Sequence, residues 1–157
     1  MPPRRRQSST PPLRELKAMA AAEAELVGDM VREAPDPHGG TGLFAVRDIA
    51  PRELALIYMG QVLTERQLYR RYPDGNPVYV MATHADRYVD AAKVLSLAAR
   101  INHTSRRPNA RFTLSDSFFP TLTNTRAIKA GTEIRVNYGK EYFMSDDGTS
   151  ANRGFDY

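Results

Sequence analysis

The sequence predicts a mainly β domain of short strands, preceded by one N-terminal helix. Three observations carry this prediction. Short stretches of β-branched and aromatic residues recur along the chain, Gly and Pro residues separate them, and clear helical periodicity is confined to the region near the N-terminus. Long helices do not alternate with the strands, so a doubly wound parallel sheet is not indicated. The 157 residues suit a single domain.

The N-terminal helix is predicted over residues 13–33, which are rich in helix formers and carry apolar residues at steps of three and four. A second helix is predicted to begin after the N-cap residue Thr64 and to end before Pro73. A short helix is predicted over residues 95–101. Strands are predicted at 43–46, 54–59, 78–82, 88–90, 110–114, 120–125 and 133–138, with 110–114 and 120–125 forming a hairpin.

Composition restricts the chemistry and the location. The chain has no cysteine, which excludes disulfides and thiolate zinc sites. Its three histidines, His38, His84 and His103, are far apart, so no metal site is expected. No apolar run approaches the ~20 residues of a membrane span, and the start lacks a signal-peptide pattern. We therefore expect an intracellular protein that does not contact a membrane.

The N-terminal residues form a basic tail, in a chain of net charge +4. Residues 1–12 are rich in Pro, Arg and Ser and are expected to be disordered. Arg4, Arg5 and Arg6 would suit contact with nucleic acid or an acidic protein surface. A tail that only improves solubility explains the same residues equally well.

Three short motifs are candidates for a binding site. Asn102-His103 follows an apolar run and offers several hydrogen-bonding groups. In Gly40-Thr41-Gly42 the glycines would allow the backbone to approach a ligand closely. Tyr138 ends the last predicted strand, where its hydroxyl could point into a cleft. Taken singly, the first two patterns are more often turns, and such a tyrosine is more often a core residue.

Taken together and in this order, the motifs resemble those of SET-domain protein lysine methyltransferases. The resemblance covers about residues 38–143 and includes no cysteine-rich zinc module before or after the domain. The matching stretches are Gly39-Gly40-Thr41-Gly42-Leu43-Phe44-Ala45, Ile57-Tyr58-Met59-Gly60, Arg87-Tyr88-Val89-Asp90-Ala91, Ala99-Arg100-Ile101-Asn102-His103 with Pro108-Asn109, and Glu133-Ile134-Arg135-Val136-Asn137-Tyr138-Gly139.

The resemblance implies a SET (β-clip-like) fold of small sheets with a C-terminal pseudoknot that brings Asn102-His103 beside Tyr138. It divides the chain into the basic tail (1–12), the helix (13–33), the SET domain (34–143) and a flexible segment (144–157) that could cover the cofactor. The implied cofactor is S-adenosylmethionine. The residues implied to bind it are Gly39, Gly40, Thr41, Gly42, Asn102 and His103, with Tyr142 and Phe143 as a lid.

The resemblance also implies two catalytic tyrosines, Tyr138 and Tyr58, and a lysine channel lined by Tyr79, Phe112 and Val136. Val136 stands where many relatives carry a larger aromatic residue that limits methyl number, so the number of methyl groups stays open. Other departures are Asn137 in place of an acid, Arg100 in place of an aromatic residue, and one extra residue before Pro108.

The function implied is S-adenosylmethionine-dependent methylation of protein lysines, with a histone or another basic protein as substrate and the nucleus as location. The alternative is a catalytically weak SET-like module that binds a protein or nucleic acid through Arg4, Arg5 and Arg6. The oligomeric state stays open, and the N-terminal helix is a candidate homodimer interface.

Overall fold

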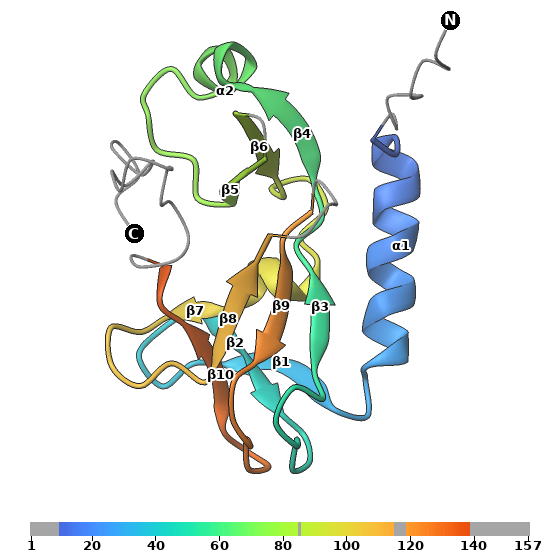
Figure 1. Cartoon of the computed structure of the whole chain (residues 1–157), viewed down its shortest axis with the longest axis vertical. Coiled ribbons are helices and arrows are strands. Elements are labelled where there is room, and N and C mark those ends of the chain that lie inside the picture. The colour runs from blue at the N-terminus through green and yellow to red at the C-terminus, as the bar shows by residue number, and fades with distance from the viewer. Residues whose placement is uncertain (1–9, 85, 115–118, 139–157) are drawn as a thin grey trace, which may run out of the picture.

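The computed structural model describes residues 10–84, 86–114 and 119–138, which form three small sheets and two helices (Figure 1). The helices are α1 (Leu13–Leu26) and α2 (Glu65–Arg71), with a 3-10 turn η1 (Leu97–Arg100). The strands are β1 (Val31–Pro35), β2 (Thr41–Ala45), β3 (Ala55–Ile57), β4 (Gln61–Thr64), β5 (Val80–Thr83), β6 (Arg87–Asp90), β7 (Asn102–His103), β8 (Ala110–Thr113), β9 (Thr121–Asn124) and β10 (Glu133–Val136). The predicted mainly β fold with an N-terminal helix is confirmed.

The N-terminal helix is shorter than predicted, because it ends at Leu26 rather than at residue 33. Residues 31–35 instead form β1, which pairs antiparallel with β2. Gly28 weakens the helix at this point, and five residue pairs between β1 and β2 outweigh the remaining helical propensity.

The last strand, β10, lies between two strands that come much earlier in the chain. It pairs antiparallel with β2 and parallel with β7, giving the sheet order β1-β2-β10-β7. The loop after β7 also bonds to β10, since the N–H of Thr104 donates to the Val136 carbonyl (2.8 Å) and the N–H of Asn109 to the Arg135 carbonyl (3.1 Å). This insertion agrees with the predicted pseudoknot and carries Tyr138 to the end of β7.

The second sheet has the order β3-β9-β8 and contains the predicted hairpin, with Phe112 opposite Leu122. The third sheet, β4-β6-β5, carries α2, whose predicted cap is confirmed. The Thr64 hydroxyl accepts from the N–H of Gln67, while the Gln67 side chain accepts from the N–H of Thr64. Among the described residues no helix is long and apolar enough to cross a bilayer.

Helix α1 lies beside β3 (Figure 1) and packs on the core through Leu16, which is fully buried. Glu23 joins the helix to the strand edge, because its Oε2 accepts from the N–H of Ile57 at 2.9 Å. The other carboxylate oxygen is buried and has no hydrogen-bond partner among the described residues. Burial raises the pKa of Glu23, and the bond from Ile57 offsets only part of that rise.

We expect Glu23→Gln to raise the melting temperature at neutral pH. A carboxyl whose pKa is higher in the folded state contributes stability below its unfolded pKa and loses it as pH rises through the folded pKa. The stabilising effect of Glu23→Gln should therefore be present at pH 7 to 8 and vanish near pH 4. Thermal unfolding of both proteins across this range checks the prediction. A constant difference at all pH values would show that charge burial at Glu23 is not the cause.

Candidate active site

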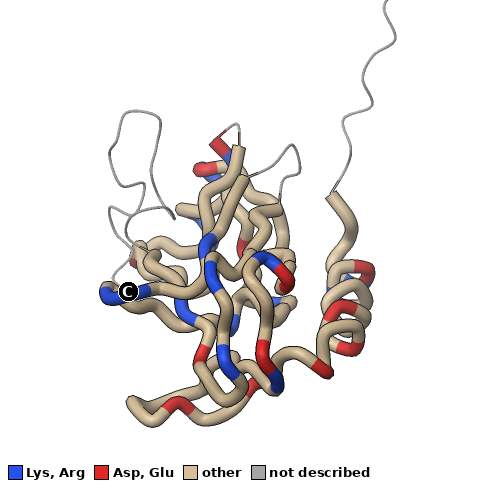
Figure 2. Tube along the Cα trace, turned by 60° about the horizontal axis from the view of Figure 1, so that its bottom comes forward, with Lys and Arg blue, Asp and Glu red and all other residues tan. Residues whose placement is uncertain are grey.

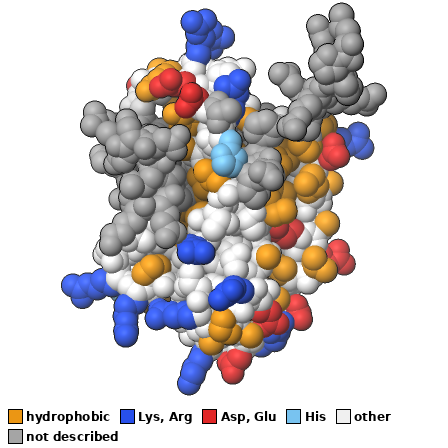
Figure 3. All heavy atoms as spheres, in the orientation of Figure 1, with side chains coloured by type: hydrophobic (Ala, Val, Ile, Leu, Met, Phe, Trp, Pro, Cys, Tyr) orange, Lys and Arg blue, Asp and Glu red, His pale blue; other side chains and the backbone are white. Residues whose placement is uncertain are grey.

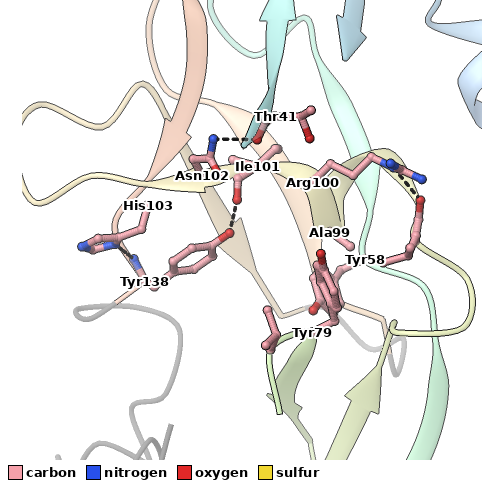
Figure 4. A pocket seen from close by; sticks show the side chains of 11 residues that line it. Thr41, Tyr58, Tyr79, Ala99, Arg100, Ile101, Asn102, His103 and Tyr138 are labelled. Carbon is pink, nitrogen blue, oxygen red and sulfur yellow. Dashed lines mark hydrogen bonds between the residues drawn. The ribbon is translucent and has the colours of Figure 1, made fainter. Parts of the chain in front are cut away.

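A pocket of about 310 Å³ lies where β2, η1, β7 and the segment just after β10 meet (Figure 4). Hydrogen-bonding groups from β2 and β7 lie on one side of it, and tyrosine rings lie on another. Its lining comprises Thr41, Tyr58, Val78, Tyr79, Leu95, Ala99, Arg100, Ile101, Asn102, His103 and Tyr138. The pocket thus collects residues from the upstream glycine motif, the Asn-His motif and the final strand.

Tyr138 is held by contacts with two neighbouring residues. Its hydroxyl donates to the carbonyl of Ile101, and its backbone N–H donates to Nδ1 of His103 at 2.9 Å. Its ring stacks on the His103 imidazole, with centroids 5.5 Å apart and planes at 16°. Because Nδ1 of His103 is the acceptor, the imidazole proton sits on Nε2 in this arrangement. These contacts fix the position of the phenol in the pocket wall.

Asn102 connects the three strands that meet beside the pocket. Its Nδ2 lies 3.0 Å from the Thr41 carbonyl, 3.0 Å from Oδ2 of Asp36 and 2.8 Å from Oε1 of Glu133. An amide nitrogen carries two hydrogens, so these three acceptors take its whole donor capacity. The Oδ1 atom of Asn102 can therefore accept a hydrogen bond from a ligand.

Asp36, Glu133 and Arg135 form a charged cluster behind Asn102. Both carboxylates are 7% exposed, and Arg135 lies 2.5 Å from Glu133 through Nε and 3.5 Å from Asp36 through Nη2. The backbone N–H of His38 and the charge of Arg135 lower the pKa of Asp36. Asp36 should thus stay ionised, and both carboxylates keep the Asn102 amide in place through their hydrogen bonds. Glu133 and Arg135 both lie in a motif recognised from the sequence. Asp36 does not, and no sequence signal distinguishes it from its loop neighbours.

The glycine motif contributes in two different ways. Gly39 and Gly40 have φ of 110° and 67°, and a side chain on either would point into open space. Gly42 packs against the Asn102 network, because a Cβ there would lie 2.2 Å from Oε1 of Glu133 and 2.8 Å from Nδ2 of Asn102. Of this motif only Thr41 lines the pocket.

We expect Gly42→Ala to disturb the site more than the fold. The added methyl group would push the Glu133 and Asn102 side chains apart, and both are side chains rather than backbone. Ligand affinity should fall about tenfold or more, with a melting temperature lowered by only a few degrees. Gly28→Ala is a matched control, because Gly28 has no positive φ, and it lies just after α1, outside the pocket lining. Equal ligand affinities for the two variants would contradict the proposed crowding.

The SET-domain family model matches residues 40–139 of this chain. The chain belongs to the SET-domain family. The match begins at the glycine motif and ends one residue after Tyr138, so it includes every motif that contributes to the pocket.

Sequence relatives include proteins named histone-lysine N-methyltransferase, H3 lysine-36 specific, from Aspergillus fumigatus and Coccidioides immitis. Each is 30% identical over 115 residues, which cover 68% of this chain and 12% or 11% of the relative. The variant-silencing SET domain-containing protein of Plasmodium falciparum is 29% identical over 119 residues and 5% of its length. The chain thus spans only a small part of these relatives.

The SET domain also superimposes on solved Polycomb Repressive Complex 2 structures. An autoinhibited Chaetomium thermophilum complex bound to S-adenosylmethionine gives a TM-score of 0.59 at 25% identity, covering 72% of this chain and 15% of that one. An active complex in the stimulated state gives 0.57 at 26% identity, covering 70% and 15%. The shared fold supports the topology described above.

Within this SET domain, the structure separates the predicted channel residues into two groups. Tyr58 and Tyr79 line the pocket with Tyr138, whereas Phe112 and Val136 are buried and do not line it. Phe112 meets Tyr58 edge to face, with centroids 5.7 Å apart and planes at 89°, so it supports the wall from behind. Tyr142 and Phe143, predicted as a lid, lie outside the described residues.

Arg100 adds a charged group to the pocket of this SET domain that the motifs alone did not place there. Its Nε donates to the Leu95 carbonyl at 2.9 Å (Figure 4). Its Nη1 pairs with Oε2 of Glu33 at 2.7 Å. The ion pair links η1 to β1 and holds a half-exposed guanidinium at the pocket edge.

Proposed function

We propose that this SET domain is an S-adenosylmethionine-dependent protein-lysine N-methyltransferase. The observation that carries the proposal is the common pocket of Tyr58, Tyr79 and Tyr138 beside Thr41 and Asn102-His103. A tyrosine wall suits an aliphatic amine side chain, and the neighbouring backbone and amide groups suit a polar cofactor. The family and the names of its sequence relatives support the same activity.

The residues present fit S-adenosylmethionine on chemical grounds. Asn102 offers an acceptor through Oδ1, Arg100 brings a cation to the pocket edge, and Gly40 has no side chain to block a close approach. We propose that Gly39, Gly40, Thr41, Asn102 and His103 hold the cofactor and that Tyr142 and Phe143 cover it. When bound, S-adenosylmethionine supplies an activated methyl group.

The tyrosine wall would prepare the substrate lysine. Free lysine has a pKa of about 10.4 and must lose a proton before it can act as a nucleophile. Tyr58 is 2% exposed, so a lysine held against its ring gives up water contacts that favour the ammonium form. Holding the neutral amine in a fixed direction supplies a large part of the acceleration expected for a displacement reaction.

Tyr138 would act at the reacting atoms. Its phenol is directed toward the Ile101 carbonyl by a hydrogen bond, which places two oxygen atoms side by side in the pocket wall. Oxygen atoms in such a wall accept weak C–H···O contacts from polarised methyl groups and help to fix their direction. We assign Tyr138 as the principal catalytic residue and Tyr58 as its partner in binding the lysine.

The proposed substrate is a basic protein, with histone H3 as the first choice because of the names of the Aspergillus and Coccidioides relatives. A histone substrate would place the chain in the nucleus. The competing proposal, a binding module without activity, depends on Arg4, Arg5 and Arg6, which lie outside the described residues.

Incubation with labelled S-adenosylmethionine and core histones tests the proposal. We expect label in a histone band and saturable binding of the cofactor measured by calorimetry. Cofactor binding without transfer to histones would redirect the search to other basic proteins by repeating the assay with a whole lysate. If the chain neither binds the cofactor nor transfers label to any protein, the enzymatic function is refuted.

A further inference from the structure

The outer face of the β8-β9 hairpin, in the β3-β9-β8 sheet, is polar and basic. Side chains on these strands alternate, and Leu56, Leu122 and Phe112 on the inner face are buried. On the outer face, Arg111 lies opposite Thr123, and Thr113 lies opposite Thr121. Arg111 and Thr113 are exposed, and neither β8 nor β9 presents an aromatic ring on this side.

A second cavity, of about 560 Å³, opens on this face beside the end of β9. Among the described residues, two arginines and four neutral hydrogen-bonding side chains line it, and no carboxylate does. The residues are Arg52, Arg111, Thr113, Thr123, Asn124 and Thr125.

The turn that carries Arg52 is fastened to β9. Asn124 is fully buried, and its Oδ1 accepts from the N–H of Leu54 (3.0 Å) while its Nδ2 donates to the carbonyls of Ala50 (2.7 Å) and Arg126 (2.9 Å). The N–H of Arg52 donates to the Asn124 carbonyl at 3.1 Å. These hydrogen bonds therefore hold the backbone of Arg52 in place, even though its φ of 60° is unusual for a residue with a side chain.

Neither guanidinium in this cavity is paired with a carboxylate of the described residues. Within the described part of the chain, Arg52 and Arg111 form no ion pair, and the neighbouring Glu53 is bound to Arg47 at 3.1 Å. Arg126, which follows the cavity residue Thr125, and Arg107 add further positive charge beside the cavity. The two residues are in contact, because Nη2 of Arg126 donates to the Arg107 carbonyl at 2.9 Å.

The pictures show the same distribution of charge. Lys and Arg recur along neighbouring segments at the centre of the molecule in Figure 2, and blue side chains gather over the lower half of the surface in Figure 3, where β8 and β9 lie. Acidic side chains in this view lie near the top, on the right-hand side and at the lower edge.

We propose that this surface binds the phosphate backbone of duplex DNA. Arginines that form no ion pair among the described residues, beside threonine hydroxyl groups, are the kind of groups that contact phosphate oxygens. An aromatic platform, which single-stranded nucleic acid uses for base stacking, is not present on the described outer face. An acidic protein segment is the other anionic partner that the charges would attract, and the test below separates the two.

The surface is distinct from the tyrosine pocket. Phe112 comes from the same strand as Arg111 but points inward against Tyr58. The sheet therefore separates the two sites, and a DNA molecule on the outer face leaves the tyrosine pocket open to a protein segment. The inference does not depend on methyltransferase activity.

The test compares two double variants of the full chain in a fluorescence anisotropy titration with a short labelled duplex. The first double variant, Arg52→Asn with Arg111→Thr, removes both positive charges of the cavity. Asn tolerates the positive φ of position 52, and Thr suits the β-strand at position 111. Arg66→Gln with Arg70→Gln on the exposed side of α2 is the control with the same charge loss. Both retain the N-terminal arginines, so the basic tail contributes equally to each.

We expect the first double variant to bind about tenfold more weakly than the control near 0.1 M salt, with the slope of log K against log salt smaller by about 2, because each phosphate contact contributes about 0.9. Equal affinities and slopes for the two variants would overturn the proposal. The proposal would also be overturned if an acidic peptide bound to this surface and the duplex did not. That result would identify a protein partner instead. Methylation of a free peptide should be unchanged, and a chain inactive as an enzyme would still give the DNA result.

Discussion

Tyr138→Phe is expected to lower methyl transfer by about 10²-fold or more while leaving the fold intact. The substitution removes one oxygen atom from the pocket wall and with it the bond to the Ile101 carbonyl. The stacking on His103 and the backbone bond to Nδ1 remain, because neither involves the hydroxyl. The loss should therefore appear in kcat, with little change in cofactor affinity or melting temperature.

The control is Tyr69→Phe, since Tyr69 lies on α2 and is 61% exposed. This variant should match the unaltered chain in both activity and stability. If Tyr138→Phe retains full turnover, Tyr138 has no catalytic role. If it loses turnover and thermal stability together, the phenol acts through the fold rather than through the reaction.

Asn102→Ala should have the largest effect on cofactor binding. It removes the amide that bridges the Thr41 carbonyl, Asp36 and Glu133, and leaves two largely buried carboxylates with one fewer donor. Deleting such a donor costs about 1–3 kcal/mol of unfolding free energy. Calorimetry with S-adenosylmethionine should show affinity reduced at least about tenfold, since both the Oδ1 acceptor and the position of β7 are lost.

Asn76→Ala offers a comparison at an asparagine outside the pocket lining. It tests whether loss of cofactor affinity is specific to the Asn102 position. A folded Asn102→Ala protein that binds S-adenosylmethionine as tightly as the unaltered chain would exclude Asn102 from the cofactor site.

The sequence predicted the elements whose periodicity is local. The β8–β9 hairpin follows from alternating residues on both sides of a turn, and the cap of α2 follows from Thr64 and Gln67 at the required spacing. The motif order also placed Thr41, Asn102-His103 and Tyr138 in one pocket, because these motifs resemble those of a known fold.

Features set by distant contacts could not be predicted. Strand β7 is only two residues long and exists because β10 inserts beside it. The helix predicted over 13–33 ends early because β1 pairs with β2, and propensity carries no information about that partner. The role of Asp36 depends on two residues that are distant in the chain. Asn102 is 66 positions away and Arg135 about 100 positions away.

The central claim is that this pocket methylates lysine, and tandem mass spectrometry of histone H3 after incubation with isotopically labelled S-adenosylmethionine tests it most directly. We predict labelled methyl groups on lysine side-chain nitrogen with the unaltered chain and strongly reduced labelling with Tyr138→Phe. Labelling confined to arginine or to other residues, or equal lysine labelling by both proteins, would contradict the proposed chemistry of the tyrosine pocket.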